Sequence, residues 1–391
     1  MPTKVLDIEF DAIPDLITGL DAYQRAMVLV RIRDRPVERV YVPVLDGEIQ
    51  GADLRNQILQ TAGRIFWEFR LREILACPLE EQHPDEPPAA TVAICTRDRP
   101  DDLLRCLEAL SRICNGQQEI LVIDSCSSTP DTYEVVRQFP AIQYVREEKP
   151  GLDRARNRAL VEARNEIVAF IDDDTVPAVG WLDALRRNFR DFDVLCVTGL
   201  TMPLELETAA QEAFEKYTPF SRGFARKVFM WNNLNPLSSG LVGVGANMAI
   251  RRSVLELVGP FDIALDGGTP ARSGGDSEMF ARILAAGYRI IYEPTALIWH
   301  RHRLSWKELR KTIYGYGVGW YAWWTRKLLF EGYLSVISVA LYWFLVGQLP
   351  VVVRSLIRRK NAPSFDLILL EILGCISGPW LYLKSRQING K

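Results

Sequence analysis

Short apolar runs alternate with amphipathic helical stretches through the middle of the chain. This alternation is typical of parallel strands joined by crossover helices. Four of the expected strands end in polar residues, and ligands of open α/β sheets bind beyond the carboxyl ends of the strands. The pattern predicts an α/β domain with a binding site along one sheet edge. The expected strands are Thr91–Cys95, Glu119–Ile123, Ala141–Val145, Ile167–Ile171 and Val194–Thr198.

A smaller unit precedes this domain. Strand-like runs at Met27–Arg31 and Val37–Val44 are followed by a helical stretch, Asp53–Leu75, with apolar spacing near 3.6. The proline-rich tract His83–Pro88 then interrupts both helix and strand, because proline fixes φ and removes a backbone donor. We therefore expect a small N-terminal accessory α/β domain at residues 1–85 and a second domain at 86–305.

The pattern changes again in the last part of the chain. Gly332–Val353 is a run of 22 uncharged residues, long enough at ~1.5 Å per residue to cross a hydrocarbon core of ~30 Å. A second apolar segment, Leu367–Leu383, is shorter and contains Glu371 and Pro379. The aromatic cluster at 320–324, next to Arg326, is typical of an interfacial belt. Residues 306–391 are expected to form membrane-associated amphipathic and hydrophobic helices.

Charge supports a membrane surface rather than nucleic acid as a partner. The whole chain has a net charge of -2, which gives no reason to expect nucleic acid. The segment from Arg301 to Lys360, however, contains eleven basic residues and only two acidic ones, Glu308 and Glu331, so its net charge is +9. Such a segment suits an anionic surface.

Cysteine usage indicates a reducing compartment. The seven cysteines are odd in number, scattered, and form no C-x-x-C pair, so reduced thiols are the simplest interpretation. The N-terminus lacks the apolar run of a secretory signal. We expect the bulk of the protein to face the cytoplasm.

The strongest local signal for chemistry is the acidic triplet Asp172-Asp173-Asp174. It follows the apolar run ending at Ile171. Carboxylates this close repel one another, so the arrangement needs a compensating cation or hydrogen-bond donors. A hard divalent ion such as Mg²⁺ or Mn²⁺, itself holding phosphates, meets that need. Taken alone, the triplet is also compatible with an acidic strand-to-helix turn that has a capping role.

Five motifs in order resemble the family 2 glycosyltransferases with the GT-A fold, and the resemblance runs from about Ala90 to Arg303. It implies a Rossmann-like domain that binds a nucleotide sugar. The motifs are Val92–Pro100, Leu121–Ser128, Pro150–Asn157 with the acidic triplet, Gly245–Arg252 and Gly274–Glu278.

The resemblance implies which residues hold the donor nucleotide. Thr96 and Asp124 would bind the base, although Asp124 without the resemblance could equally cap a loop. Arg156 would lie near the donor phosphates or brace the acidic turn. Asp173 would meet the ribose. Arg97, Asp98, Asn157 and Asp172 complete the expected donor-binding set.

It also implies the metal ligands and the catalytic base. Asp174 would hold the ion, with Asp172 sharing or supporting it, and His300 of the His300-x-His302 pair is expected to face inward. Asp276 is the expected general base, since a carboxylate can take the proton of an attacking hydroxyl. The alternative for Asp276 is a helix N-cap. Many relatives have an acidic residue immediately before this base, whereas Gly275 stands here.

The expected function is metal-dependent, inverting transfer of a sugar from a UDP-, GDP- or dTDP-sugar to a lipid-linked or glycan acceptor at the cytoplasmic side of the cell membrane. An interface-lying hairpin is favoured over a spanning one, because spanning would place the basic loop at 354–360 outside. Alternatives are a nucleotidyltransferase, a non-catalytic membrane or glycan-binding pseudoenzyme, and, for the C-terminal segments, the buried hairpin of a soluble dimer. Homo-oligomerisation is left open.

Overall fold

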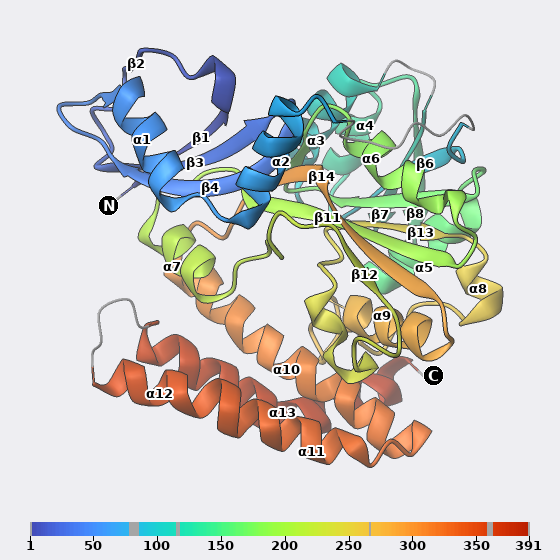
Figure 1. Ribbon diagram of the computed structural model, residues 1–391. Helices are drawn as coiled ribbons and strands as arrows, with labels where there is room; N and C mark the ends of the chain where they lie inside the picture. The colour runs from blue at the N-terminus through green and yellow to red at the C-terminus, as the bar shows by residue number, and fades with distance from the viewer. Residues whose placement is uncertain (1, 78–85, 115–117, 266, 358–362, 390–391) are drawn as a thin grey trace.

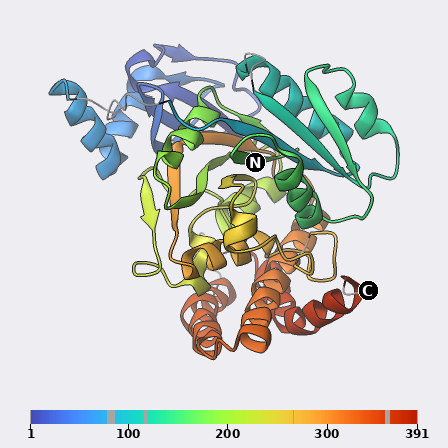
Figure 2. The ribbon, with the colours of Figure 1, turned by 90° about the vertical axis from the view of Figure 1, so that its right-hand side faces the viewer.

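The computed structural model describes residues 2–77, 86–114, 118–265, 267–357 and 363–389. Its largest element is a nine-stranded sheet with helices on both faces (Figure 1). A three-stranded sheet with two helices packs beside one edge, and a group of long helices lies along the base (Figures 1 and 2). The predicted boundary at His83–Pro88 falls partly outside the described residues.

All five strands predicted for the large sheet are present. The sheet order is β10-β14-β11-β13-β9-β6-β7-β8, with β12 on β14. Strands β9, β6, β7 and β8 are parallel, so their carboxyl ends meet at one edge. The strands are β6 (Ala90–Thr96), β7 (Glu119–Ser125), β8 (Ile142–Glu147), β9 (Ile167–Asp172), β10 (Thr175–Pro177), β11 (Val194–Pro203), β12 (Lys227–Phe229), β13 (Asn247–Arg251) and β14 (Arg289–His300).

Separate apolar clusters cover the two faces of this sheet. One includes Leu107 of α3 and Trp181 of α6, and the other includes Leu160 of α5 and Phe280 of α9. Burial on both faces explains why the strands read as continuous apolar runs. The helices of this part are α3 (Pro100–Ile113), α4 (Asp131–Val136), α5 (Leu152–Glu162), α6 (Trp181–Arg186), α7 (Ala209–Tyr217), α8 (Val254–Leu257) and α9 (Gly275–Ala285), with 3₁₀ turns η2 (Arg187–Arg190) and η3 (Pro236–Leu241).

The N-terminal unit is an α/β unit, as predicted, but its helical stretch is broken. Two helices replace the single helix expected at 53–75, because Gly63 leaves the helix and its N–H donates to Glu38 Oε2 at 2.7 Å. Met27 and Leu29 of its sheet pack against Leu200 and Tyr292 of the large sheet. Its elements are β1 (Thr3–Glu9), η1 (Phe10–Ala12), β2 (Leu16–Ile17), β3 (Arg25–Ile32), β4 (Arg35–Pro43), β5 (Ile49–Gln50), α1 (Gly51–Thr61) and α2 (Arg64–Ile74).

The C-terminal part is helical, as predicted. Two segments, Ser335–Leu356 and Phe365–Ile388, are long and apolar enough to cross a membrane, and only 6% and 33% of their most apolar windows are buried. Both run lengthwise along the base of the molecule in Figure 1. The helices are α10 (Trp306–Glu331), α11 (Ser335–Tyr342), the π-helical η4 (Trp343–Gln348), α12 (Leu349–Leu356) and α13 (Phe365–Asn389).

The prediction that the aromatic cluster at 320–324 forms an interfacial belt is wrong for Trp323 and Trp324. Trp323 and Trp324 of α10 are buried at 0% and 3% exposure, because α10 packs between the large domain and α13. Arg326 pairs with Glu278 and Glu331 instead of facing headgroups. These side chains anchor α10 to the large domain.

Glycines bring α10 and α13 into close backbone contact. A Cβ at Gly317 of α10 would lie 2.1 Å from the Glu371 carbonyl oxygen, and one at Gly374 of α13 would lie 2.2 Å from the Tyr314 carbonyl oxygen. The glycines therefore hold α13 firmly on α10, as small residues do in helix pairs of membrane proteins.

Replacing Gly317 tests this contact. Gly317→Ala should lower the free energy of unfolding by about 1–3 kcal/mol, because the new methyl group overpacks the interface. At the exposed Gly347, where a Cβ would meet only Trp343 at 3.9 Å, the same change should be neutral or stabilise by up to about 1 kcal/mol. Denaturant unfolding of the two variants measures the difference, and equal effects would contradict the close packing.

Candidate functional site

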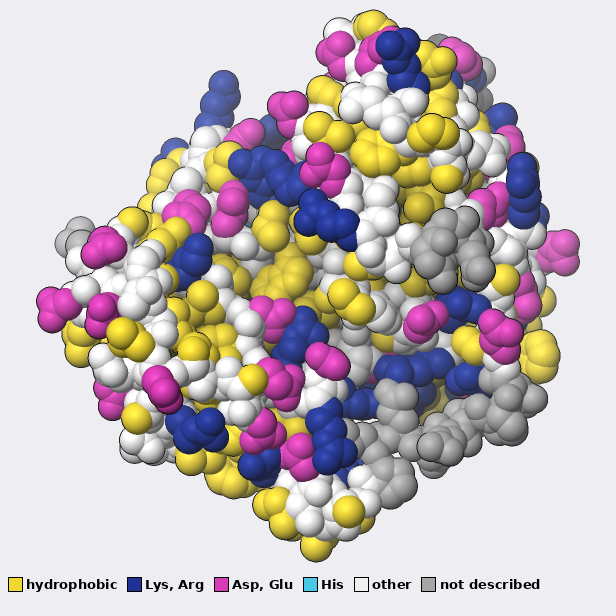
Figure 3. Space-filling model, turned by 90° about the horizontal axis from the view of Figure 1, so that it is seen from above, with side chains coloured by type: hydrophobic (Ala, Val, Ile, Leu, Met, Phe, Trp, Pro, Cys, Tyr) yellow, Lys and Arg dark blue, Asp and Glu magenta, His cyan; other side chains and the backbone are white. Residues whose placement is uncertain are grey.

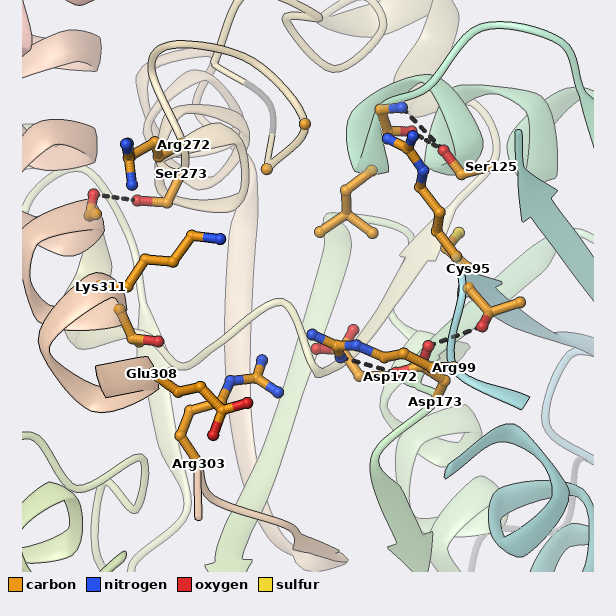
Figure 4. Close-up of a pocket in the computed structure, with 18 of the residues that line it drawn as sticks. Cys95, Arg99, Ser125, Asp172, Asp173, Arg272, Ser273, Arg303, Glu308 and Lys311 are labelled. Atoms are coloured by element: carbon orange, nitrogen blue, oxygen red, sulfur yellow. Dashed lines mark hydrogen bonds and ion pairs between the residues drawn. The ribbon is translucent and has the colours of Figure 1, made fainter. Parts of the chain in front are cut away.

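The carboxyl ends of the parallel strands open into a cavity of about 580 Å³. Figure 4 shows its two walls. Cys95, Arg99, Ser125, Asp172 and Asp173 lie on one side, and Arg272, Ser273, Arg303, Glu308 and Lys311 lie on the other. The first wall comes from the sheet edge. The second comes from the loop before α9, the segment after β14, and α10, so the C-terminal part contributes directly to the site.

A second cavity of about 210 Å³ adjoins the first, and both are lined by Asp172, Arg303 and Tyr316. The second cavity is also lined by Asp276 and His300. The acidic turn and the expected catalytic base therefore face one continuous space.

The acidic turn follows β9, and its three carboxyl groups lie in different environments. Burial raises the pKa of Asp172 to about 6, with the Asp174 charge adding to the effect. Burial also raises the pKa of Asp173 to about 7, against the opposing charge of Arg99. Burial alone would raise the pKa of Asp174, but that pKa lies below its ordinary value, with the charges of Arg303 and Arg99 opposing the effect of burial. Asp174 is thus the group most firmly kept as an anion.

Arginines offset the charge of the turn. Arg99 Nη1 lies 3.2 Å from both Asp173 and Asp174, and Arg303 Nη1 lies 3.2 Å from Asp174 Oδ2. Asp173 also accepts a hydrogen bond from Thr96 Oγ1 at 2.8 Å. These contacts fix the turn beside the cavity.

Asp172, Asp174 and His300 form a cluster whose ligand atoms all lie within 4.8 Å of one another. His300 Nε2 is 3.2 Å from Asp174 Oδ1, and burial lowers the pKa of His300 to about 4, so the imidazole is neutral near pH 7. Asp174 Oδ1 is buried without a hydrogen-bond partner. Two carboxylates, a neutral imidazole and an unsatisfied buried oxygen fit a divalent cation.

Asp276 lies in the first turn of α9 and does not cap it, since the N-cap is Gly274. Its Oδ2 accepts from the Gly245 N–H at 2.9 Å, and its Oδ1 accepts from the Ser277 N–H at 2.7 Å. Oδ1 also accepts a long hydrogen bond from Ser277 Oγ at 3.5 Å, which leaves a further lone pair on Oδ2.

The glycine before Asp276 has a structural reason. A Cβ at Gly275 would lie 1.7 Å from Asp153 Oδ2, so the Asp153 carboxylate occupies the place of a side chain at position 275. Asp153 also pairs with Arg156 at 3.0 Å.

The predicted donor-binding residues are only partly brought together. Thr96, Arg97, Asp172 and Asp173 line the larger cavity, and Arg156 lines the smaller one. Among the described residues, Asp98, Asp124 and Asn157 line neither.

The three residues away from the cavities have other partners. Asp124 accepts from Tyr144 Oη at 2.6 Å, Arg146 Nη1 at 3.1 Å and the Ser127 N–H at 2.8 Å. Asp98 caps the Ser128 N–H at 2.6 Å. Both groups of the Asn157 amide bond to the Phe261 backbone. Asp124 thus makes the contact of a loop cap, and its neighbour Ser125 lines the larger cavity.

Several cavity residues were not predicted from the sequence. Arg99 and Arg303 were missed, although Arg99 lies inside the motif Val92–Pro100 and Arg303 directly follows the His300-x-His302 pair. These positions were the available signal. Arg272 and Lys311 had no such signal, because only the fold brings the loop before α9 and the start of α10 to the cavity.

Comparisons with known proteins identify the kind of domain that carries this site. Residues 91–259 match the family described as Glycosyl transferase family 2. The chain is 28% identical over 232 residues to the pre-mycofactocin glycosyltransferase of Mycobacterium tuberculosis, covering 58% of this chain and 46% of that protein. It is 27% identical over 273 residues to glycosyltransferase AglE of Haloferax volcanii, covering 67% of this chain and 82% of that protein.

A solved structure shares the fold. It is the mannosyltransferase PcManGT from Pyrobaculum calidifontis in complex with GDP-Man and Mn²⁺. The TM-score is 0.55 at 18% identity, covering 81% of this chain and 94% of that one.

The chain therefore contains a glycosyltransferase domain of the GT-A fold, as predicted. Residues 91–259 of this domain match glycosyltransferase family 2. The chain spans about half the length of the mycobacterial relative.

Removing the buried Asp174 oxygen tests the metal site. Asp174→Asn should weaken Mn²⁺ binding by at least about 100-fold, the upper end of the loss seen when an outer ligand partner is removed. The matched change Asp102→Asn should leave the Mn²⁺ affinity unchanged, because Asp102 pairs with Arg301 and Arg105 instead. Electron paramagnetic resonance of free Mn²⁺ measures both affinities, and equal affinities would contradict the assignment.

Proposed function

We propose that the protein transfers a sugar from a nucleotide-sugar donor to an acceptor hydroxyl with inversion, using a divalent cation. The observation that carries this proposal is the shared cavity system, in which Asp172 of the acidic turn and Asp276 face the same space. Nucleotide-bound relatives of the fold, such as the mannosyltransferase with GDP-Man and Mn²⁺, support the donor class. The base and the sugar of the donor stay open among UDP-, GDP- and dTDP-sugars.

Asp276 is the proposed base. As the acceptor oxygen attacks the anomeric carbon, its proton passes to the Asp276 carboxylate, and the bond to the nucleoside diphosphate breaks on the opposite side. A bound Mg²⁺ or Mn²⁺ would offset negative charge on the leaving diphosphate, held by Asp172, Asp174 and His300. Arg99 and Arg303 line the same cavity and are placed to take part of that charge.

The acceptor is proposed to enter beside α10. Glu308, Lys311 and Tyr316 of this helix line the cavity, and the same helix carries α13 on its other side. Lys311 and Arg272 form no ion pair in the described part of the chain, and they give this wall a positive charge. A lipid-linked acceptor that carries phosphate fits such a wall better than a neutral glycan does.

Membrane association is proposed through the C-terminal helices. Exposed apolar side chains gather on α11, η4, α12 and α13, including Ile337, Leu341, Leu345 and Ile376. The opposite face, in Figure 3, mixes Lys and Arg with Asp and Glu. Because these helices lie along the base of the molecule, they favour a hairpin lying in the interface over one that spans the membrane. The cytoplasmic side is proposed because nucleotide sugars are made there.

Asp276→Asn tests the reaction. Transfer should fall by about 10²–10⁴-fold, the usual contribution of a general base, while donor affinity stays at the wild-type value. The assay measures release of nucleoside diphosphate from a panel of nucleotide sugars with Mn²⁺, using lipid-linked and soluble glycans as separate acceptors.

The same assay separates the alternatives. A nucleotidyltransferase would instead release nucleoside triphosphate when given pyrophosphate, and a pseudoenzyme would release neither product. Loss of donor affinity in Asp276→Asn would reject its assignment as the base.

Membrane binding is tested by charge insertion. Leu341→Glu with Leu345→Glu should weaken binding to anionic vesicles at least about 100-fold, since each buried leucine contributes about 1.5–3 kcal/mol. The control changes Leu71→Glu and Leu75→Glu, at exposed leucines of the N-terminal unit, should have no effect. Vesicle co-sedimentation measures both, and equal binding of the two variants would reject the C-terminal surface.

A further inference from the structure

A chain of buried polar groups runs from the N-terminal unit to the acidic turn. Arg39 of β4 donates to Glu215 Oε1 on α7. Glu215 Oε2 lies 3.1 Å from His302 Nε2, and His302 Nδ1 lies 3.3 Å from His300 Nδ1. His300 Nε2 then faces Asp174 Oδ1 at 3.2 Å. His300 was the expected inward histidine, but the structure buries both.

Aromatic rings enclose this chain. The ring of Phe214 lies 4.3 Å from that of His302, and the ring of Phe220 lies 5.1 Å from that of His300. The side chains of His302 and Glu215 are only 1% and 6% exposed. Glu215 and His302 therefore have little access to water, and their polar atoms depend on hydrogen-bond partners within this chain of groups.

The hydrogen-bond directions follow from Glu215. Its carboxylate can only accept, so His302 Nε2 carries a proton and donates it. In a neutral His302, Nδ1 then has a lone pair and accepts from His300 Nδ1–H. That leaves a lone pair on His300 Nε2, facing Asp174. Two lone pairs meet at this point, which explains why Asp174 Oδ1 lacks a hydrogen bond.

We propose that Glu215 and His302 are positioning residues that hold His300 in its Nδ1–H form, so that Nε2 presents a lone pair to a divalent cation. The inference rests on the metal dependence proposed above. Carboxylate and imidazole partners behind a metal-binding histidine fix its orientation and raise its basicity. Neither residue contacts the candidate ligand Asp172.

The same contacts give the N-terminal unit a role. Arg39 occupies one oxygen of Glu215 and leaves the other for His302. A residue of the accessory sheet therefore helps to orient a ligand of the catalytic domain.

The tautomer of each histidine can be measured by nuclear magnetic resonance. The chain has three histidines, so a long-range ¹H–¹⁵N spectrum of the full-length protein in detergent, labelled at histidine, shows three imidazoles. His83→Gln and His302→Asn assign them. We expect His302 as Nε2–H and His300 as Nδ1–H in the metal-free protein. A proton on His300 Nε2, or a charged His302, would overturn the proposal.

Metal affinity provides the second measurement. His302→Phe keeps a ring against Phe214 but removes the acceptor for His300, and it should weaken binding of Mn²⁺ alone by about 10–100-fold. His302→Asn should restore most of the affinity, because its amide oxygen can replace Nδ1 as acceptor. Glu215→Gln should lower the affinity for Mn²⁺ about tenfold.

Glu212→Gln is the matched control. Glu212 lies on the same helix and also binds the N-terminal unit, through Thr3 and Arg25, but no contact links it to His302. Its variant should bind Mn²⁺ as the wild type does. An equal loss in Glu212→Gln and Glu215→Gln, or no loss in His302→Phe, would overturn the positioning role. Absence of Mn²⁺ binding to the wild type would refute the metal dependence, and the tautomer spectrum would still decide the histidine arrangement.

Discussion

The site depends on one electrostatic constraint, the presence of three consecutive carboxyl groups at the end of a buried strand. Strand β9 is covered on both faces, so the turn that follows it cannot expose all three groups to water. Arg99 and Arg303 neutralise part of this charge, and Thr96 donates to Asp173. The remaining unsatisfied oxygen, Asp174 Oδ1, faces His300. The neighbouring elements thus supply positive charge or donors where the turn needs them.

The sequence predicted the strands of the large sheet because their burial on both faces leaves an unambiguous apolar signal. The resemblance to family 2 glycosyltransferases implied one site for Asp172, Asp173 and Asp276. Asp172 lines both cavities, Asp173 the larger and Asp276 the smaller. The sequence could not predict which side chain turns inward at a strand end. Asp124 and Ser125 are adjacent, and the partners Tyr144 and Arg146, which come from the neighbouring strand β8, decide that Asp124 turns away.

Helix α10 shows why composition alone was misleading in the C-terminal part. Its aromatic and basic residues resemble a membrane belt in sequence, but Trp323 is fully buried and Arg326 pairs with Glu278 of α9. The helix binds the catalytic domain on one side, and through Gly317 it binds α13 on the other. The apolar surface that remains exposed lies one layer further out, on α11, η4, α12 and α13.

Helix α10 lies between the cavity and the outer helices that carry the exposed apolar surface. A Cβ at Gly319 of α10 would lie 2.1 Å from Ser273 Oγ, and a Cβ at Gly274 would lie 2.9 Å from the Gly319 carbonyl oxygen. These contacts fix the loop that leads directly into Asp276. Because Gly317, two residues away, contacts α13, the same turn of α10 contacts both the loop before Asp276 and the outer helix. A domain attached in this way cannot shift relative to its C-terminal helices without moving the loop that precedes Asp276.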